Sequence, residues 1–229
     1  MRYECEQVEL KRKDDGTDLY LTKFWCPASW QDKNILMVHG LTYTQHVFDI
    51  KYKDYSVCEY FAKNGYTVWR LDLSGYGKSG KYEDGWKVTT QHAAEDEIYA
   101  LEKICELQGV EKLDLLGWSW GTMTTSKVAS QHPDLLKKVV WLGPCFGGAF
   151  EATPVTELHG MWVDHTYAQD GGHGRPNGGA KEIMEIGDGW LIDTKAVKLL
   201  HLHGAGHAMY LEKDYYQTTR EAILKFISE

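Results

Sequence analysis

The sequence lacks the features that mark several large classes of protein. It contains only five cysteines, an odd number at wide spacing, with no Cys-x-x-Cys pair. This usage argues against a disulfide framework and is typical of reduced thiols in a cytoplasmic protein. The first residues hold no apolar stretch like that of a signal peptide, and no window approaches about 18 uninterrupted apolar residues. We therefore expect a cytoplasmic location and no association with a membrane.

An excess of basic residues is also absent. Lys and Arg number 25 against 33 Asp and Glu, which gives a formal net charge of -8. Proteins that bind nucleic acids usually present a basic face, so we expect no nucleic-acid partner. The 229 residues, 43% of them hydrophobic, suffice for one well-filled core. No internal repeat occurs at a fixed period, and we predict a single domain with a small insertion.

Short apolar segments alternate with amphipathic ones along most of the chain. Strands are predicted at 3–10, 19–25, 35–38, 66–71, 113–116, 139–142 and 197–203, and helices at 89–109, 122–130 and 216–227. This alternation predicts an α/β fold with a mostly parallel central sheet and helices on both faces. The pattern breaks in a glycine-rich stretch. We predict a core of 1–143 and 191–229 with a cap-like insertion at 144–190.

The stretch Gly117-Trp118-Ser119-Trp120-Gly121 matches G-x-S-x-G directly after a predicted strand and directly before a predicted helix. In that context a serine lies on a sharp strand-to-helix turn, and its Oγ projects clear of the backbone. Glycine two residues before and after avoids clashes with the neighbouring strand and helix. The helix N-terminus adds backbone donors and the positive end of its dipole. The motif therefore predicts that Ser119 is a nucleophile.

A nucleophilic serine also needs a general base and backbone donors for the oxyanion. We expect the donors to be the N–H of Trp120, which follows the serine, and that of Leu41, which follows an earlier strand. His207 follows the last predicted strand and precedes the last helix, where a base later in the chain than the nucleophile belongs. His201 and His203 could join it in a metal site, but no carboxylate cluster supports one. We expect neither a metal nor another cofactor.

Four segments together resemble the α/β-hydrolase superfamily. They are ILMVHGL (35–41), VWRLDLSGYGKSG (68–80), LDLLGWSWG (113–121) and GAGHAMYLE (204–212). The resemblance implies an α/β-hydrolase fold with a catalytic triad and an oxyanion hole. The chain is similar to proline iminopeptidases as well as to generic esterases. Haloalkane dehalogenases and epoxide hydrolases in this superfamily carry an aspartate at the nucleophile position, so the resemblance with Ser119 in that place argues against both activities.

In most of the superfamily the acid that orients the histidine follows the penultimate strand, and a helix separates that strand from the last one. Here GDGWLIDTKAVK runs directly into LLHLHGAGH, and a strand and helix of about 30 residues have no counterpart. Either the protein is a compact variant or part of this region is absent. Asp193 is the first candidate for the acid, although a solvent-facing linker residue fits as well. Asp188 is the second candidate for the acid and Glu151 is the third.

The sequence therefore predicts a serine hydrolase that cleaves a small-molecule ester. The tryptophans and the stretch after residue 144 favour an apolar or aromatic acyl site, which we expect Trp118, His46 and Trp162 to line. Two alternatives stay open. One is an amide hydrolase, such as an aminopeptidase, in which Glu151 or Glu157 would anchor a free amine. The other is a non-catalytic ligand receptor on the same scaffold. The sequence leaves the oligomeric state open.

Overall fold

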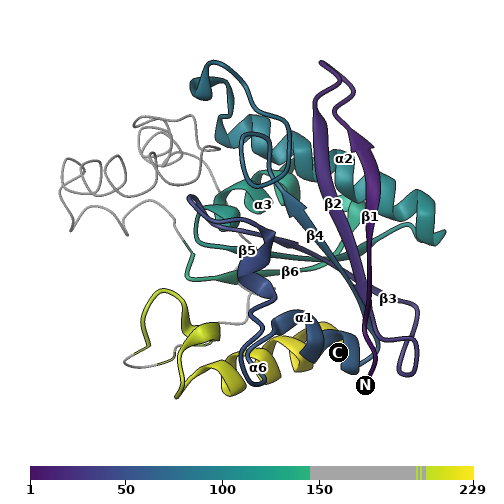
Figure 1. The fold of residues 1–229 in the computed structure, drawn as a ribbon, viewed down its shortest axis with the longest axis vertical. Helices are drawn as coiled ribbons and strands as arrows, with labels where there is room; N and C mark the ends of the chain where they lie inside the picture. Colours follow the sequence, from purple (N-terminus) through teal and green to yellow (C-terminus); the bar gives the residue numbers. More distant parts are fainter. Residues whose placement is uncertain (145–199, 201, 203–204) are drawn as a thin grey trace.

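A computed structural model describes residues 1–144, 200, 202 and 205–229 (Figure 1). The predicted cap-like insertion at 144–190 therefore lies, apart from Pro144, outside the described residues. The strands are β1 (Glu4–Lys11), β2 (Asp18–Trp25), β3 (Lys33–Val38), β4 (Tyr66–Asp72), β5 (Leu113–Trp118) and β6 (Leu136–Leu142). The helices are α1 (Val57–Lys63), α2 (Thr90–Gln108), α3 (Trp120–Gln131) and α6 (Tyr216–Ser228). Short 3-10 helices are η1 (Gln45–Phe48), η2 (Gly85–Lys87), η3 (Pro133–Leu135) and η5 (Met209–Leu211).

The described strands form one sheet in the order β1-β2-β4-β3-β5-β6. The pairs β4–β3, β3–β5 and β5–β6 are parallel, whereas β2 runs antiparallel to both β1 and β4. The predicted mostly parallel α/β sheet is thus confirmed. Because parallel strands end at the same edge of a sheet, the residues that follow β3, β5 and β6 meet there.

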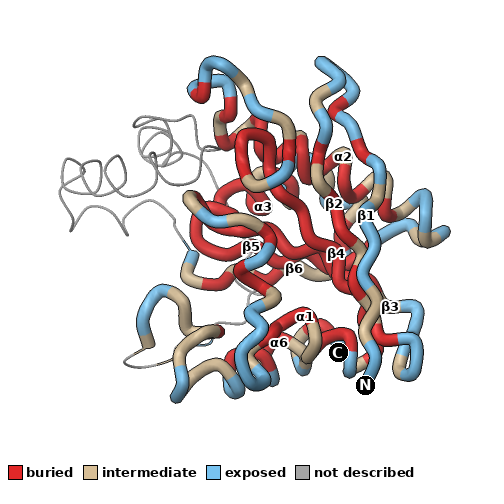
Figure 2. Tube along the Cα trace, in the orientation of Figure 1, coloured by how far each residue is buried: buried red, intermediate tan, exposed pale blue. Residues whose placement is uncertain are grey.

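Helices cover both faces of the sheet, α2 and α3 on one and α1 and α6 on the other (Figure 1). Alternate residues of β3 divide between the two cores. Leu36 and Val38 pack with residues of α2 and α3, whereas Ile35 and Met37 pack with residues of α1 and α6. The central strands are therefore buried on both faces (Figure 2), as their continuous apolar runs predict.

Local sequence signals mark the start of α1 and both ends of α2. The Thr89 side chain accepts a hydrogen bond from the N–H of His92 at the start of α2, and Gly109 ends that helix in the left-handed conformation at φ 64°. The sequence pattern did not predict α1, which begins with Ser56 accepting from the N–H of Glu59. Of the strand predicted at 197–203, only Leu200 and Leu202 are described, and neither lies in a strand.

Two expectations from the composition, on cysteine pairing and on membrane-spanning helices, can be compared with the structure. Of the five cysteines, the four that are described, Cys5, Cys26, Cys58 and Cys105, are free thiols. No helix in the described ranges combines the length and apolar character needed to cross a bilayer. The cytoplasmic location stays a prediction.

A buried aspartate joins two loops at the edge of the sheet where β3 and β4 end. Asp72 is 1% exposed, and its Oδ1 accepts a hydrogen bond from the N–H of Gln45 at 2.7 Å. Its Oδ2 accepts from the N–H of Lys78 at 2.9 Å, within the glycine-rich turn after β4. The Asp72 carboxylate therefore links the loop after β3 to the loop after β4 through hydrogen bonds.

Asp114 places a second carboxyl group inside the sheet, opposite Ile35 of β3. The residue is 5% exposed, and its Oδ1 makes no hydrogen bond in the described part of the chain. Burial raises the pKa of Asp114 to about 6, although Lys137 and Lys138 oppose the shift. Because this pKa lies above the unfolded value of about 4, ionisation destabilises the folded state increasingly as pH rises through this interval.

Replacing this carboxyl group by an amide is expected to stabilise the protein above about pH 6 and not near pH 4. Asp114→Asn should raise the free energy of unfolding by about 1–3 kcal/mol at pH 8, where the carboxylate is charged, and change it little near pH 4. Urea denaturation at both pH values measures the difference. The exposed Asp134 provides a matched control, since Asp134→Asn should change little at either pH. An Asp114→Asn protein no more stable than the wild type at pH 8 would contradict this account.

Candidate active site

Ser119 occupies a strained turn between β5 and α3. Its φ of 57° and ψ of -125° are rare for a residue other than glycine and cost about 1–3 kcal/mol. The surrounding structure holds the strained backbone in place. The Ser119 N–H donates to the carbonyl of Leu142 at 3.0 Å, and its own carbonyl accepts from the N–H of Thr122 at 2.8 Å. The serine is therefore fixed to β6 on one side and to α3 on the other.

Glycines allow the backbone segments around Ser119 to approach one another closely. A Cβ on Gly117 would lie 2.3 Å from the carbonyl oxygen of Gly121, and one on Gly121 would lie 2.7 Å from the carbonyl oxygen of Val38. A Cβ on Gly40 would lie 2.8 Å from the Cβ of Ser119. The contacts explain why both positions of the motif are glycine, and they bring the loop after β3 against the serine.

The two predicted oxyanion donors flank the serine. Trp120 is the first residue of α3, and Leu41 follows Gly40 in the loop that contacts Ser119. The Leu41 N–H donates no hydrogen bond to any described residue. The next residue, Thr42, has a φ of 79°, a conformation that strains a β-branched side chain. This backbone is compatible with an oxyanion hole, and the role of the two amides stays a prediction.

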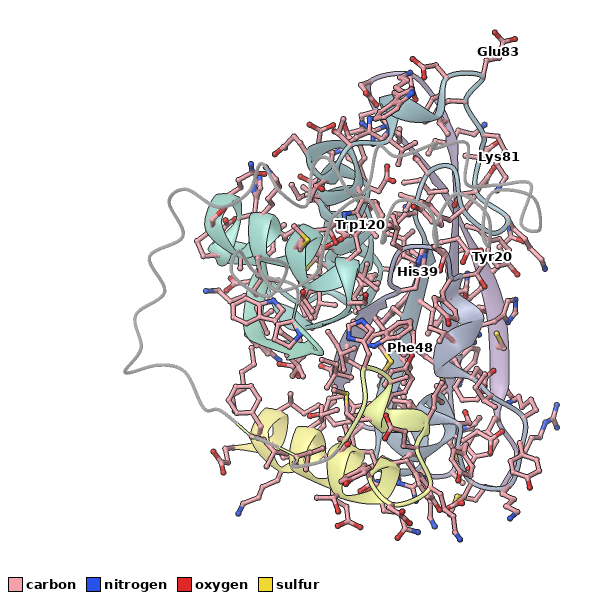
Figure 3. All side chains as sticks on the ribbon, turned by 90° about the vertical axis from the view of Figure 1, so that its left-hand side faces the viewer. Tyr20, His39, Phe48, Lys81, Glu83 and Trp120 are labelled. Carbon is pink, nitrogen blue, oxygen red and sulfur yellow. The ribbon has the colours of Figure 1, made fainter. Side chains whose placement is uncertain are left out.

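His39 fixes the shape of the loop after β3. Its Nε2 accepts a hydrogen bond from the N–H of Leu73 at 3.2 Å, which assigns the proton to Nδ1. Nδ1 then donates to the carbonyl of Gly40 at 2.8 Å. Figure 3 labels His39 at the end of β3 and Trp120 at the start of α3. His39 thus links two loops at this edge of the sheet.

His207 reaches Ser119 from the C-terminal part of the chain, 88 residues away. Its Nε2 lies 2.8 Å from the Oγ of Ser119. Neighbouring atoms displace part of the water around the imidazole, which disfavours the cation and lowers the pKa of His207. The histidine is therefore neutral near pH 7, the state in which Nε2 can accept the serine proton. The two residues predicted as nucleophile and base lie in hydrogen-bonding contact.

The acid of a triad is not among the described residues. The other ring nitrogen of His207, Nδ1, lies against Gly143, where an added Cβ would approach it to 2.9 Å. In the described part of the chain no carboxylate bonds to this imidazole or shifts its pKa. The candidates Asp193, Asp188 and Glu151 all lie within 145–199, which the structure does not describe. The identity of the acid stays a prediction.

Aromatic side chains surround the pair. Trp118 is 3% exposed, and its ring meets that of Tyr43 edge-on at 4.9 Å between centroids. Its indole N–H donates to the carbonyl of His207 at 3.0 Å. His46 is exposed at the start of η1, and Trp162 lies outside the described ranges. Trp118 is thus in contact with the candidate pair, whereas a substrate contact for His46 or Trp162 stays a prediction.

Two neighbours of this site were not predicted from the sequence. Tyr43, with 49% of its surface exposed, follows Leu41 by two residues and borders Trp118. Gly143 directly follows β6 and has a φ of 53°. A glycine directly after a parallel strand is the signal that could have identified Gly143. Tyr43 carries no comparable signal.

The chain is similar to known proteins over most of its described part. A sequence model of the alpha/beta hydrolase fold matches residues 33–171, more than half of the chain. An epoxide hydrolase from Vigna radiata is 19% identical with a TM-score of 0.51, and the match covers 72% of this chain and 48% of that one. Potato (Solanum tuberosum) epoxide hydrolase I is 22% identical with a TM-score of 0.53 and the same coverage.

At these identities the structural similarity bears on the fold alone. This chain spans about half the length of the two epoxide hydrolases. The family match covers β3 to β6, including the loop after β3 and the whole G-x-S-x-G turn. The protein belongs to the α/β-hydrolase fold family.

Proposed function

We propose that this protein is a serine hydrolase that cleaves carboxylic esters through an acyl-enzyme on Ser119. One observation carries the proposal: the Oγ of Ser119, held on a strained turn, lies 2.8 Å from the Nε2 of His207. A hydroxyl is a weak nucleophile unless a base removes its proton as it attacks. A neutral imidazole at hydrogen-bonding distance supplies that base.

In the proposed reaction Ser119 Oγ attacks the carbonyl carbon of the ester while Nε2 of His207 takes its proton. Negative charge then develops on the carbonyl oxygen, where the N–H groups of Leu41 and Trp120 would donate hydrogen bonds. The tetrahedral intermediate collapses as His207 gives the proton to the departing alcohol. Water, activated by the same histidine, next attacks the acyl group and releases the acid.

The chemistry of a serine nucleophile favours an ester over an epoxide, although the structural neighbours are epoxide hydrolases. Attack by Ser119 on an epoxide carbon would form an ether between enzyme and substrate. An ether has no carbonyl carbon for water to attack, so the product would remain bound after one turnover. Attack on an ester forms an acyl group on the serine, which water can remove.

Two alternatives have less support. An amide demands more of the general acid, because an amine leaves less readily than an alcohol unless it is protonated. The carboxylates that could anchor a free amine, Glu151 and Glu157, lie beyond the described ranges. A non-catalytic receptor has no need of a serine hydroxyl in contact with an imidazole. Comparing rates on a simple ester and an aminoacyl amide separates ester from amide hydrolysis.

Removing the proposed nucleophile should abolish turnover. Ser119→Ala is expected to lower kcat/KM on p-nitrophenyl butyrate by about a thousandfold or more, because no acyl-enzyme can form. The measurement is release of p-nitrophenol under initial-rate conditions. Ser126→Ala is the matched control, since Ser126 is a buried serine of α3, the helix that follows Ser119, and its hydroxyl bonds only to the carbonyl of Thr122 among described residues. Full activity in Ser119→Ala would refute the proposal.

Activity should depend on the neutral form of His207. As pH falls through the pKa of His207, protonation removes the lone pair that accepts the serine proton, and the rate declines. Because burial lowers this pKa, the midpoint is expected below the ordinary histidine value of about 6.5. The pH profile of inactivation by a fluorophosphonate measures it. A midpoint above 6.5 would contradict the expectation, because it would mean that a carboxylate such as the predicted Asp193 outweighs the effect of burial on this pKa.

A further inference from the structure

The two tryptophans of the G-x-S-x-G turn point to opposite faces of the sheet. Trp118 is the last residue of β5, and its side chain joins the core formed with α1 and α6. Trp120 belongs to the core formed with α2 and α3, where its indole N–H donates to the Oγ1 of Thr90 at 3.1 Å. The alternation of side chains along a strand explains why Trp118 faces the C-terminal part of the chain.

Trp118 contacts the segment that carries His207 through both its indole N–H and its ring. The N–H donates to the main-chain carbonyl of His207 at 3.0 Å, across 89 residues of sequence. The indole and imidazole centroids are 5.6 Å apart, and the ring of Tyr210 meets the indole edge-on at 5.4 Å. One side chain thus joins the strand that leads to Ser119 to the residue that contacts the serine.

Few contacts with described residues restrain the His207 side chain. Its imidazole has no carboxylate partner in the described part of the chain, and the ring is bordered by Ser119, Trp118 and Gly143, none of them charged. One further hydrogen bond lies next to it, from the N–H of Gly206 to the Oε2 of Glu212 at 3.1 Å. The hydrogen bond from Trp118 to the main chain at residue 207 is therefore one of the described restraints on where the imidazole lies.

We propose that Trp118 is a positioning residue, whose indole N–H holds His207 against Ser119 by binding the His207 carbonyl. Its predicted effect on rate rests on the proposed function, whereas its effect on the placement of His207 does not. A base and a nucleophile react efficiently only within a narrow range of geometry, and a displacement of about 1 Å can cost a hundredfold in rate. Loss of the hydrogen bond should therefore lower kcat and leave KM nearly unchanged.

Trp118→Phe tests this directly, because phenylalanine keeps an aromatic ring and removes the N–H. Trp69→Phe is the matched control: Trp69 is fully buried in β4, and its indole donates to the Oδ1 of Asn34 at 3.0 Å. For Trp118→Phe we expect kcat on p-nitrophenyl butyrate to fall about tenfold or more and KM to change by less than about twofold. The control should change kcat by less than about twofold. Equal kcat in both variants would overturn the proposal.

A second measurement does not depend on activity. The pKa of His207, followed by NMR titration of its imidazole, lies below the ordinary value while the ring is partly buried. In Trp118→Phe the released ring should gain water, and this pKa should rise toward about 6.5, with no change in Trp69→Phe. An unchanged pKa in Trp118→Phe would overturn the proposal, whereas full activity of Ser119→Ala would overturn only the proposed function.

A measurement on the wild-type protein covers the case in which Trp118→Phe fails to fold. If its N–H is bonded to the His207 carbonyl, the indole proton of Trp118 should exchange with deuterium at least about tenfold more slowly than that of Trp86, which is 45% exposed. Slow exchange supports the hydrogen bond in solution. Exchange as fast as that of Trp86 would overturn the proposal.

Discussion

The close approach of three backbone segments at Gly117 and Gly121 is the constraint on which the site depends. β5 runs into α3 at a turn so tight that a Cβ at either glycine would collide with backbone atoms. The turn holds Ser119 in a strained conformation at the edge where parallel strands end. Because the loop after β3 packs against the same point through Gly40, the serine lies beside the backbone that would stabilise an oxyanion.

The two tryptophans of this turn pack into different hydrophobic cores, one on each face of the sheet. Each of them contacts a different part of the site. Trp120 anchors the start of α3 to α2, which stabilises the helix whose first amide would face the oxyanion. Trp118 reaches the opposite face and contacts the segment that carries His207. A five-residue motif thus supplies the proposed nucleophile, one proposed oxyanion donor and the contact that places the proposed base.

Most of the sheet could be predicted from the sequence, because its central strands are apolar runs, its first two strands alternate, and its turns carry glycine or aspartate. The first helix was missed, although Ser56 and Glu59 form a capping signal at its start, because α1 is only seven residues long. The pairing of Ser119 with His207 could be predicted, because His207 follows the last predicted strand, where the base of a G-x-S-x-G enzyme is expected. The bond from Trp118 to His207 could not be predicted, because strand alternation gives the face of a side chain and not its partner across 89 residues. The three candidates for the acid lie within 145–199, outside the described residues, and Asp193 stays a prediction.

The central claim is that Ser119 carries the acyl group during turnover. The most direct measurement is to mix the protein with a p-nitrophenyl ester, quench in acid within the burst phase, and map the acylated peptide by mass spectrometry. The account predicts the mass of one acyl group on the peptide that contains Ser119, localised to the serine between Trp118 and Trp120. Turnover with the acyl group on another residue, or with no adduct under conditions that trap acyl-enzymes, would contradict it.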